Sequence, residues 1–115
     1  MPRKGLLDLS VLCQMKSAAF LINVARAEIV DEDALYEALA ERSIAGAALD
    51  VWYRYPRAAG PTPPATRPFR DLPNVLMTPH ISGWTDGMLE SRAKLIAENI
   101  RRVAACETPL NLVDP

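Results

Sequence analysis

The sequence predicts an α/β fold in which about three parallel strands form part of a doubly wound sheet with flanking helices. Two strand-sized apolar runs, residues 18–24 and 44–51, are separated by a helical pattern, and a third run begins at Val75. A strand, helix, strand unit usually forms a right-handed parallel crossover. Nearly continuous apolar strands are typical of parallel sheets covered on both faces. We therefore expect the first strand to be buried on both sides.

Two helices are expected in the first half of the chain. The first covers residues 6–16, where apolar side chains recur at helical spacing: Leu6, Leu9, Leu12 and Met15. The second begins after Asp31, a residue type that suits the N-cap position, and runs to about Arg42. Acidic residues follow in its first turn, where the helix dipole favours negative charge. Its expected apolar face consists of Leu35, Ala38 and Leu39.

A proline-rich loop precedes the third strand. Residues 52–73 hold most of the ten prolines of the chain, and this density excludes a helix or a central strand. A loop of this length is commonly a functional lid or a mobile insert. The third strand is expected over residues 75–78, parallel to the other two.

A long helix is expected over residues 85–106. It would carry one apolar stripe, in which the following residues recur at helical spacing: Leu89, Ala93, Ile96, Ile100 and Val103. Oppositely charged residues four positions apart support the same helix. These pairs are Glu90 with Lys94 and Glu98 with Arg102.

Composition narrows the class of protein. The 115 residues carry a net charge of -1, so no basic surface suggests nucleic acid as a partner. No apolar run approaches the roughly 18 residues that a membrane-spanning helix needs. Cys13 and Cys106 stand far apart without further ligand residues, which favours a reducing, cytoplasmic location over a disulfide. Since His80 is the only histidine, no clustered metal site is expected.

Three charged side chains follow the three expected strands: Arg26, Asp50 and His80. The carboxyl ends of parallel strands share one rim, with neighbouring strands about 4.8 Å apart, and open α/β sheets bind ligands there. A guanidinium can hold a carboxylate through two parallel hydrogen bonds, and a histidine can donate a proton near neutral pH. Each residue alone also has an ordinary structural explanation. Together on one rim they suit a small 2-oxo or 2-hydroxy acid.

Three ordered segments resemble one enzyme family: FLINVARAEIVDEDALYEALAE, AGAALDVW and NVLMTPHISG. They are similar to the carboxy-terminal half of the nucleotide-binding domain of the D-isomer-specific 2-hydroxyacid dehydrogenases. The resemblance runs from about Leu6 to Val113. It implies a partial Rossmann-like sheet, NAD or NADP as cofactor, and hydride transfer between the nicotinamide and a small 2-oxo or 2-hydroxy acid.

The resemblance also implies roles for individual residues. Arg26 corresponds to the arginine that binds the substrate carboxylate, and His80 to the acid that protonates the developing alkoxide. Asp50 corresponds to the carboxylate that holds the nicotinamide carboxamide. Backbone positions near the nicotinamide match Val24 and Ala25, next to Arg26, and Gly83, after the histidine.

Two positions depart from the family pattern. The segment that usually reads DVF-x-x-E-P is DVWYRYP here, so Tyr55 stands where the family has a glutamate beside the histidine. A carboxylate there would favour the imidazolium, whereas a tyrosine offers a hydrogen bond without charge at neutral pH. Two interpretations stay open: Tyr55 alters the acid–base chemistry, or it is a lid residue that supports an unusual substrate. Ala27 replaces the usual glycine after the arginine.

No GxGxxG motif occurs in these 115 residues. By the resemblance, residues 1–115 correspond to the carboxy-terminal portion of a dinucleotide-binding domain, and the helix over residues 85–106 would return to an absent substrate domain. We expect an incomplete chain that is inactive alone and that pairs as a homodimer or with its missing amino-terminal half. The alternative is a non-catalytic piece that acts only in interaction or assembly.

Overall fold

The computed structural model describes residues 5–56 and 60–113, which form two units, Met1–Ser82 and Gly83–Pro115, each described here by itself. The first unit contains three strands: β1 (Phe20–Asn23), β2 (Gly46–Leu49) and β3 (Val75–Met77). Its helices are α1 (Leu9–Leu12) and α2 (Glu32–Ala40), with two short 3-10 helices, η1 (Ala27–Ile29) and η2 (Phe69–Asp71). The second unit contains α3 (Met88–Ala104).

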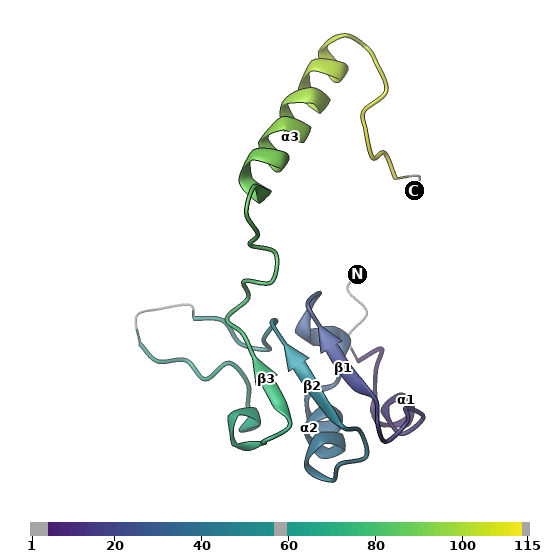
Figure 1. The fold of residues 1–115 in the computed structure, drawn as a ribbon, viewed down its shortest axis with the longest axis vertical. Helices are drawn as coiled ribbons and strands as arrows, with labels where there is room; N and C mark the ends of the chain where they lie inside the picture. The colour runs from purple at the N-terminus through teal and green to yellow at the C-terminus, as the bar shows by residue number, and fades with distance from the viewer. Residues whose placement is uncertain (1–4, 57–59, 114–115) are drawn as a thin grey trace. The chain divides into compact units, whose positions relative to one another are not determined.

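The three strands form one parallel sheet, as the sequence predicts, and their order in the sheet is β1-β2-β3 (Figure 1). Ile22 pairs with Ala48, and Ala48 pairs in turn with Leu76. Each strand is shorter than its apolar run, because the run continues into the loop beyond the last ladder pair. Because the three strands are parallel, their carboxyl ends lie at one rim of the sheet.

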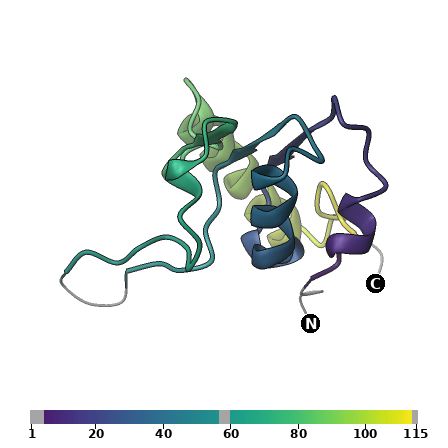
Figure 2. The same ribbon diagram turned by 90° about the horizontal axis from the view of Figure 1, so that it is seen from below.

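Helix α2 confirms the predicted cap and the predicted apolar face. The side chain of Asp31 accepts a hydrogen bond from the backbone N–H of Ala34 at 2.9 Å, which satisfies one of the unpaired donors at the helix start. The face that includes Leu35 and Leu39 is buried against the sheet, on the side that Figures 1 and 2 show covered by α2. The largest fully buried side chains of the core are Phe69, Leu12, Leu35, Leu39, Ile44 and Val30.

The prediction that the first strand is buried on both faces is wrong. Leu21 and Asn23 are buried, whereas Phe20 and Ile22 are 69% and 70% exposed. The reason is that α2 covers only one face of the sheet. On the other face, Ile22 and Leu76 stand in one row of paired positions, and both are exposed.

The first helix is much shorter than the predicted span of residues 6–16. Leu7 forms an isolated parallel bridge with Val30, so the chain is extended there. The helix then begins after Asp8, whose carboxylate accepts a hydrogen bond from the N–H of Val11. Of the four predicted apolar positions only Leu12 is fully buried.

The second half of the proline-rich loop is hydrogen-bonded to the first turn of α2. The Glu32 carboxylate, in the first turn of α2, accepts hydrogen bonds from the backbone N–H groups of Thr66 and Arg67. The Arg67 guanidinium pairs with Asp33, and it also lies 5.7 Å from the centre of the Tyr36 ring. Beyond this clamp the side chain of Phe69 is buried in the core, so this half of the loop is part of the packed structure.

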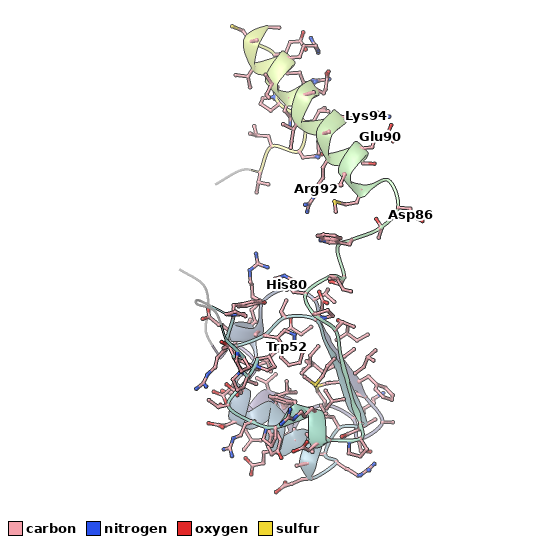
Figure 3. All side chains as sticks on the ribbon, turned by 90° about the vertical axis from the view of Figure 1, so that its left-hand side faces the viewer. Trp52, His80, Asp86, Glu90, Arg92 and Lys94 are labelled. Atoms are coloured by element: carbon pink, nitrogen blue, oxygen red, sulfur yellow. The ribbon has the colours of Figure 1, made fainter. Side chains whose placement is uncertain are left out.

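The second unit contains the predicted long helix, trimmed at both ends. It begins only after Gly87, which has a φ of 76° and so breaks the helical path. Both predicted charge pairs form: Glu90 with Lys94 at 2.6 Å, projecting from the same side of α3 in Figure 3, and Glu98 with Arg102 at 2.8 Å. Within its unit the apolar stripe of α3 is exposed. No helix in the described part of the chain is long and apolar enough to cross a membrane.

Gly46 should be the most size-sensitive position of the sheet. A Cβ added there would lie 2.6 Å from the backbone oxygen of Asn74 and 3.2 Å from the Phe20 ring. We expect Gly46→Ala to lower the free energy of unfolding by about 1–3 kcal/mol, as overpacking does, measured by urea unfolding. Gly83→Ala is the matched control, because nothing lies within 4 Å of that position. Equal stability of the two variants would contradict the prediction.

Candidate functional site

The loop that carries Arg26 is shaped by a buried asparagine at the end of β1. Asn23 Nδ2 donates to the backbone oxygen of Arg26 at 3.0 Å, and Asn23 Oδ1 accepts from the N–H of Ala25 at 3.1 Å. This turn fixes the backbone and leaves the Arg26 side chain exposed. The guanidinium donates to the Ala25 oxygen at 2.7 Å, and within the described residues it forms no ion pair. It is therefore available to an anionic ligand.

Asp50, directly after β2, holds the turn that contains the histidine. Its side chain is 2% exposed, and its Oδ1 accepts from Thr78 Oγ1 at 2.6 Å and from the N–H of Ile81 at 2.9 Å. Oδ2 accepts from the N–H of Ser82 at 2.9 Å. Burial acts to raise the pKa of the Asp50 carboxyl, but these hydrogen bonds outweigh it and hold the pKa well below its usual range. The carboxylate is thus charged, and it fastens β2 to the segment after β3.

His80 sits in an uncommon backbone conformation. Its φ is 60°, in the left-handed region that costs a residue with a Cβ on the order of 1 kcal/mol or more. The hydrogen bonds that Asp50 accepts from Thr78, Ile81 and Ser82 flank His80 on both sides and stabilise this turn. The imidazole ring remains exposed at the rim.

Tyr55 and Trp52 complete the support of the histidine. The Tyr55 hydroxyl lies 2.8 Å from His80 Nδ1, and the two ring centres are 5.6 Å apart. The same hydroxyl accepts a hydrogen bond from the backbone N–H of Trp52 at 3.2 Å. The indole Nε1 of Trp52, in turn, donates to the backbone oxygen of Thr78 at 2.9 Å. Tyr55, at the position of the family's glutamate, therefore contacts the histidine directly.

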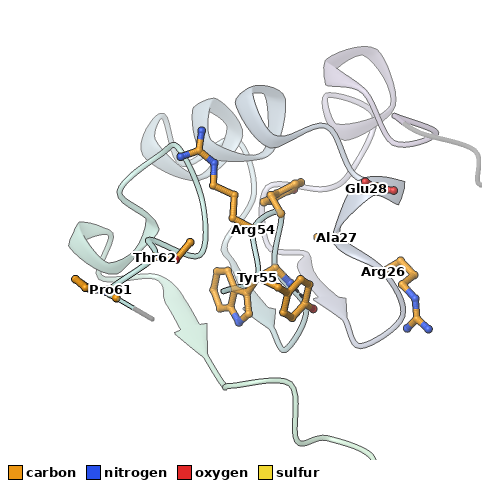
Figure 4. Close-up of a pocket in the computed structure, with 10 residues that line it drawn as sticks. Arg26, Ala27, Glu28, Arg54, Tyr55, Pro61 and Thr62 are labelled. Carbon is orange, nitrogen blue, oxygen red and sulfur yellow. Dashed lines mark hydrogen bonds between the residues drawn. The ribbon is translucent and has the colours of Figure 1, made fainter. Parts of the chain in front are cut away.

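Two open cavities meet at Tyr55. The larger, of about 640 Å³, is drawn in Figure 4 and is bordered by residues 26–28, 52–55 and 60–62. The smaller, of about 380 Å³, is bordered by Tyr55 and His80 together with mostly apolar residues. Arg26 and His80 thus line different cavities. In Figure 4 the Arg26 side chain points away from Tyr55.

The structure brings some predicted site residues together and leaves others apart. Tyr55 is hydrogen-bonded to His80, and Asp50 is connected to this pair through Thr78 and Trp52. Arg26 lies on the same rim without a contact to this group in the described residues. Val24 and Ala25 are exposed between β1 and Arg26. Gly83 opens the second unit and is outside this geometry.

Sequence reasoning missed three residues that build the site: Asn23, Trp52 and Thr78. Each lies within three residues of a predicted site residue, at the end of a strand or just beyond it. A polar side chain at such a position is a usable signal, because buried polar atoms at a strand end need hydrogen-bond partners. No group of three or more His, Cys, Asp or Glu residues that could hold a metal exists in residues 5–56 and 60–113.

Comparison with known proteins gives a consistent result. The sequence profile described as "D-isomer specific 2-hydroxyacid dehydrogenase, NAD binding domain" matches residues 2–82. The chain is 39% identical over 104 residues to glyoxylate/hydroxypyruvate reductase B of Pectobacterium carotovorum subsp. carotovorum (strain PC1), covering 90% of this chain and 31% of the relative. It is 41% identical over 103 residues to glyoxylate reductase of Thermofilum pendens, covering 90% and 29%. The chain therefore spans about a third of the length of these curated relatives.

Solved structures share the fold. A D-isomer specific 2-hydroxyacid dehydrogenase from Xanthobacter autotrophicus Py2, in complex with NADPH and MES, superposes with a TM-score of 0.78 at 40% identity, covering 100% of this chain and 45% of that one. The NAD-complexed enzyme from Lactobacillus delbrueckii ssp. bulgaricus gives a TM-score of 0.79 at 30% identity, covering 99% and 37%. The predicted α/β fold, a partial Rossmann-like sheet, is confirmed.

Asp50 should make the free energy of unfolding of the first unit depend on pH in the acid range. Its folded-state pKa is lowered, so its stabilising effect is full above its unfolded pKa of about 4 and is lost as pH falls through the lower folded value. We expect Asp50→Asn to lower stability at neutral pH and to flatten the decline of stability below about pH 4. Urea unfolding at a series of pH values measures both effects. Asp71→Asn, at an exposed ion pair with Arg70, is the control; an unchanged acid slope in Asp50→Asn would contradict the assignment.

Proposed function

Since this chain belongs to the D-isomer specific 2-hydroxyacid dehydrogenases, we propose that it supplies the nicotinamide-side part of an NAD(P)-dependent dehydrogenase. The reaction is hydride transfer between the nicotinamide and a small 2-hydroxy or 2-oxo acid. The observation that carries this proposal is the rim itself, where an available guanidinium, a buried carboxylate and an exposed imidazole follow three adjacent parallel strands. Open α/β sheets bind ligands at this edge.

Arg26 binds the substrate. Its side chain is exposed and forms no ion pair within the described residues, so a planar carboxylate can take two parallel hydrogen bonds from the guanidinium. This pairing would hold the 2-oxo acid. Positive charge beside the carbonyl oxygen, where negative charge develops during reduction, requires the exposed Arg26 side chain to turn from the cavity that it lines toward the one that His80 lines.

His80 handles the proton. A bound nicotinamide would supply hydride to the carbonyl carbon. His80, when its ring carries a proton on both nitrogens, would give the Nε2 proton to the oxygen on which negative charge develops. The ring is suited to this step because Nδ1 is held by Tyr55 at 2.8 Å and the backbone is held by the partners of Asp50.

The residues present fit a nicotinamide. A carboxylate offers about four lone-pair positions, and the donors to Asp50 are Thr78, Ile81 and both the backbone and the side chain of Ser82. An amide N–H of the cofactor would take the place of one of these donors, such as the Ser82 hydroxyl. Val24 and Ala25 are exposed residues beside Arg26, where the Ala25 N–H and oxygen are bonded to Asn23 and Arg26, and Gly83 follows the histidine turn in the sequence. We propose NAD or NADP as the cofactor and glyoxylate or hydroxypyruvate as test substrates. A cytoplasmic setting suits Cys13 and Cys106, which are both free.

A chimera tests this function. We expect the amino-terminal portion of the Pectobacterium carotovorum reductase, joined to this chain at the matched segment, to reduce glyoxylate with NADH or NADPH. His80→Asn should lower kcat by roughly 100-fold or more, as the loss of a general acid does. Arg26→Gln should raise KM and lower kcat, because it removes the carboxylate-binding guanidinium.

Controls separate chemistry from folding. Arg70→Gln, at an exposed arginine paired with Asp71, should leave the rate unchanged. The 115-residue chain alone should show no turnover, and calorimetry should show no micromolar binding of NADH. A folded chimera that binds NADH but is inactive would refute the proposal, as would a His80→Asn variant with full activity.

A second candidate function is assembly without catalysis. The face of the sheet opposite α2 exposes Phe20, Ile22 and Leu76, and contiguous apolar surface of this kind marks interaction sites. Such a chain would associate with a second copy or with a separately encoded amino-terminal half.

Light scattering tests whether the chain associates through this sheet face. If the uncovered sheet face is an interface, the purified chain should be dimeric or larger, and Ile22→Lys should return it to a monomer because a charge cannot be buried there unpaired. Leu112→Lys, at an exposed position of the second unit, is the control. A monomeric and fully folded chain, alone and mixed with the amino-terminal half, would rule the assembly function out.

A further inference from the structure

The Tyr55 hydroxyl lies between two nitrogens of different hydrogen-bonding character. On one side is the backbone N–H of Trp52 at 3.2 Å, and on the other is His80 Nδ1 at 2.8 Å. A backbone N–H can only donate, whereas an imidazole nitrogen donates or accepts depending on where the ring carries its proton. The direction of the bond between Tyr55 and His80 therefore decides the tautomer of the neutral ring.

The proton arrangement follows from the partners. The phenol oxygen accepts the hydrogen of Trp52, and its second lone pair could also accept from an Nδ1–H of His80. Only the direction in which the phenol hydrogen points to Nδ1 gives that hydrogen a partner among the described residues. An Nδ1 that accepts a hydrogen bond carries no proton, so the neutral ring carries its proton on Nε2. Nε2 has no hydrogen-bond partner among the residues that the structure describes, and it is the nitrogen left for a ligand.

The surroundings of the ring favour this arrangement. The cavity beside His80 is bordered by Trp52, Arg54 and Tyr55 among mostly apolar residues, and none of its described lining residues is acidic. The charged carboxylate of Asp50 is occupied by Thr78, Ile81 and Ser82, so it does not take Nδ1. Tyr55 is thus the group in the described residues that binds Nδ1.

The geometry is fixed on both sides of the hydrogen bond. Trp52 is buried and is tied to the end of β3 by its indole bond to Thr78. The His80 turn is held by the hydrogen bonds of Asp50. Tyr55 is 47% exposed. Its hydroxyl nevertheless has a fixed position, because it is hydrogen-bonded to Trp52 and to His80, which are both held in place.

We propose that Tyr55 is a positioning residue that keeps the proton of the neutral His80 ring on Nε2. Relative to the proposed dehydrogenase function, on which this consequence rests, the neutral ring then presents its Nε2–H to the substrate oxygen as a hydrogen-bond donor before reaction. A carboxylate in place of Tyr55 would act oppositely: it can only accept, so it would bind an Nδ1–H and leave Nε2 bare on the neutral ring.

The single histidine makes a direct test possible. In a ¹⁵N-labelled sample of this chain, the imidazole signals come from His80 alone. At a pH where the ring is neutral, the Nε2 resonance should have the position of a protonated nitrogen and Nδ1 that of a hydrogen-bonded acceptor. Tyr55→Phe should shift the Nδ1 resonance to that of an unbonded nitrogen, and Tyr55→Glu should move the proton toward Nδ1.

Tyr36→Phe is the matched control, since it removes a hydroxyl from another partly exposed tyrosine and should leave the imidazole signals unchanged. The backbone amide spectrum shows whether each variant is folded. A proton on Nδ1 in the unaltered chain would overturn the proposal, and so would identical imidazole signals in the unaltered chain and a folded Tyr55→Phe. Because no turnover is measured, these outcomes are independent of the chimera assay that tests the dehydrogenase function.

Discussion

The buried carboxylate of Asp50 is the interaction on which the candidate site depends. A charge removed from water is costly unless hydrogen bonds replace the lost solvation. Here the donors are the Thr78 hydroxyl and the N–H groups of Ile81 and Ser82, all from the segment that carries the histidine. The same hydrogen bonds therefore solvate the Asp50 carboxylate and hold His80 at a φ of 60°. If the turn relaxed, the carboxylate would lose its partners while still buried.

The sheet supplies the geometry that makes this interaction possible. Parallel pairing places the ends of β2 and β3 side by side, so that Asp50 can reach the turn after β3. Trp52 adds a second connection to the same strand end through Thr78. Farther along, the bonds of Glu32 to Thr66 and Arg67 fasten the proline-rich loop to α2. Tyr55 belongs to the first part of this loop and is held by Trp52 and His80.

Much of this fold could be predicted from sequence, because its signals are local. The cap at Asp31, the apolar face of α2 and the presence of three parallel strands follow from spacing and residue type. The exposed face of β1 could not be predicted, since an apolar run does not reveal what covers it. The short first helix reflects the bridge of Leu7 to Val30, a contact between separate segments. The rim residues were predictable, but the bond from Tyr55 to His80 depends on how the loop folds back.

The uncovered apolar surface and the candidate site are physically separable. The side-chain hydrogen bonds that connect Asp50, Tyr55 and His80 to their neighbours come from residues 50–82, at the rim of the sheet. The exposed side chains Phe20, Ile22 and Leu76 lie on a face of the sheet and make none of these bonds. Covering that face would add hydrophobic stabilisation in proportion to the area buried. It would raise the stability of the unit without changing the partners of His80, so association through that face is compatible with the geometry of the candidate site.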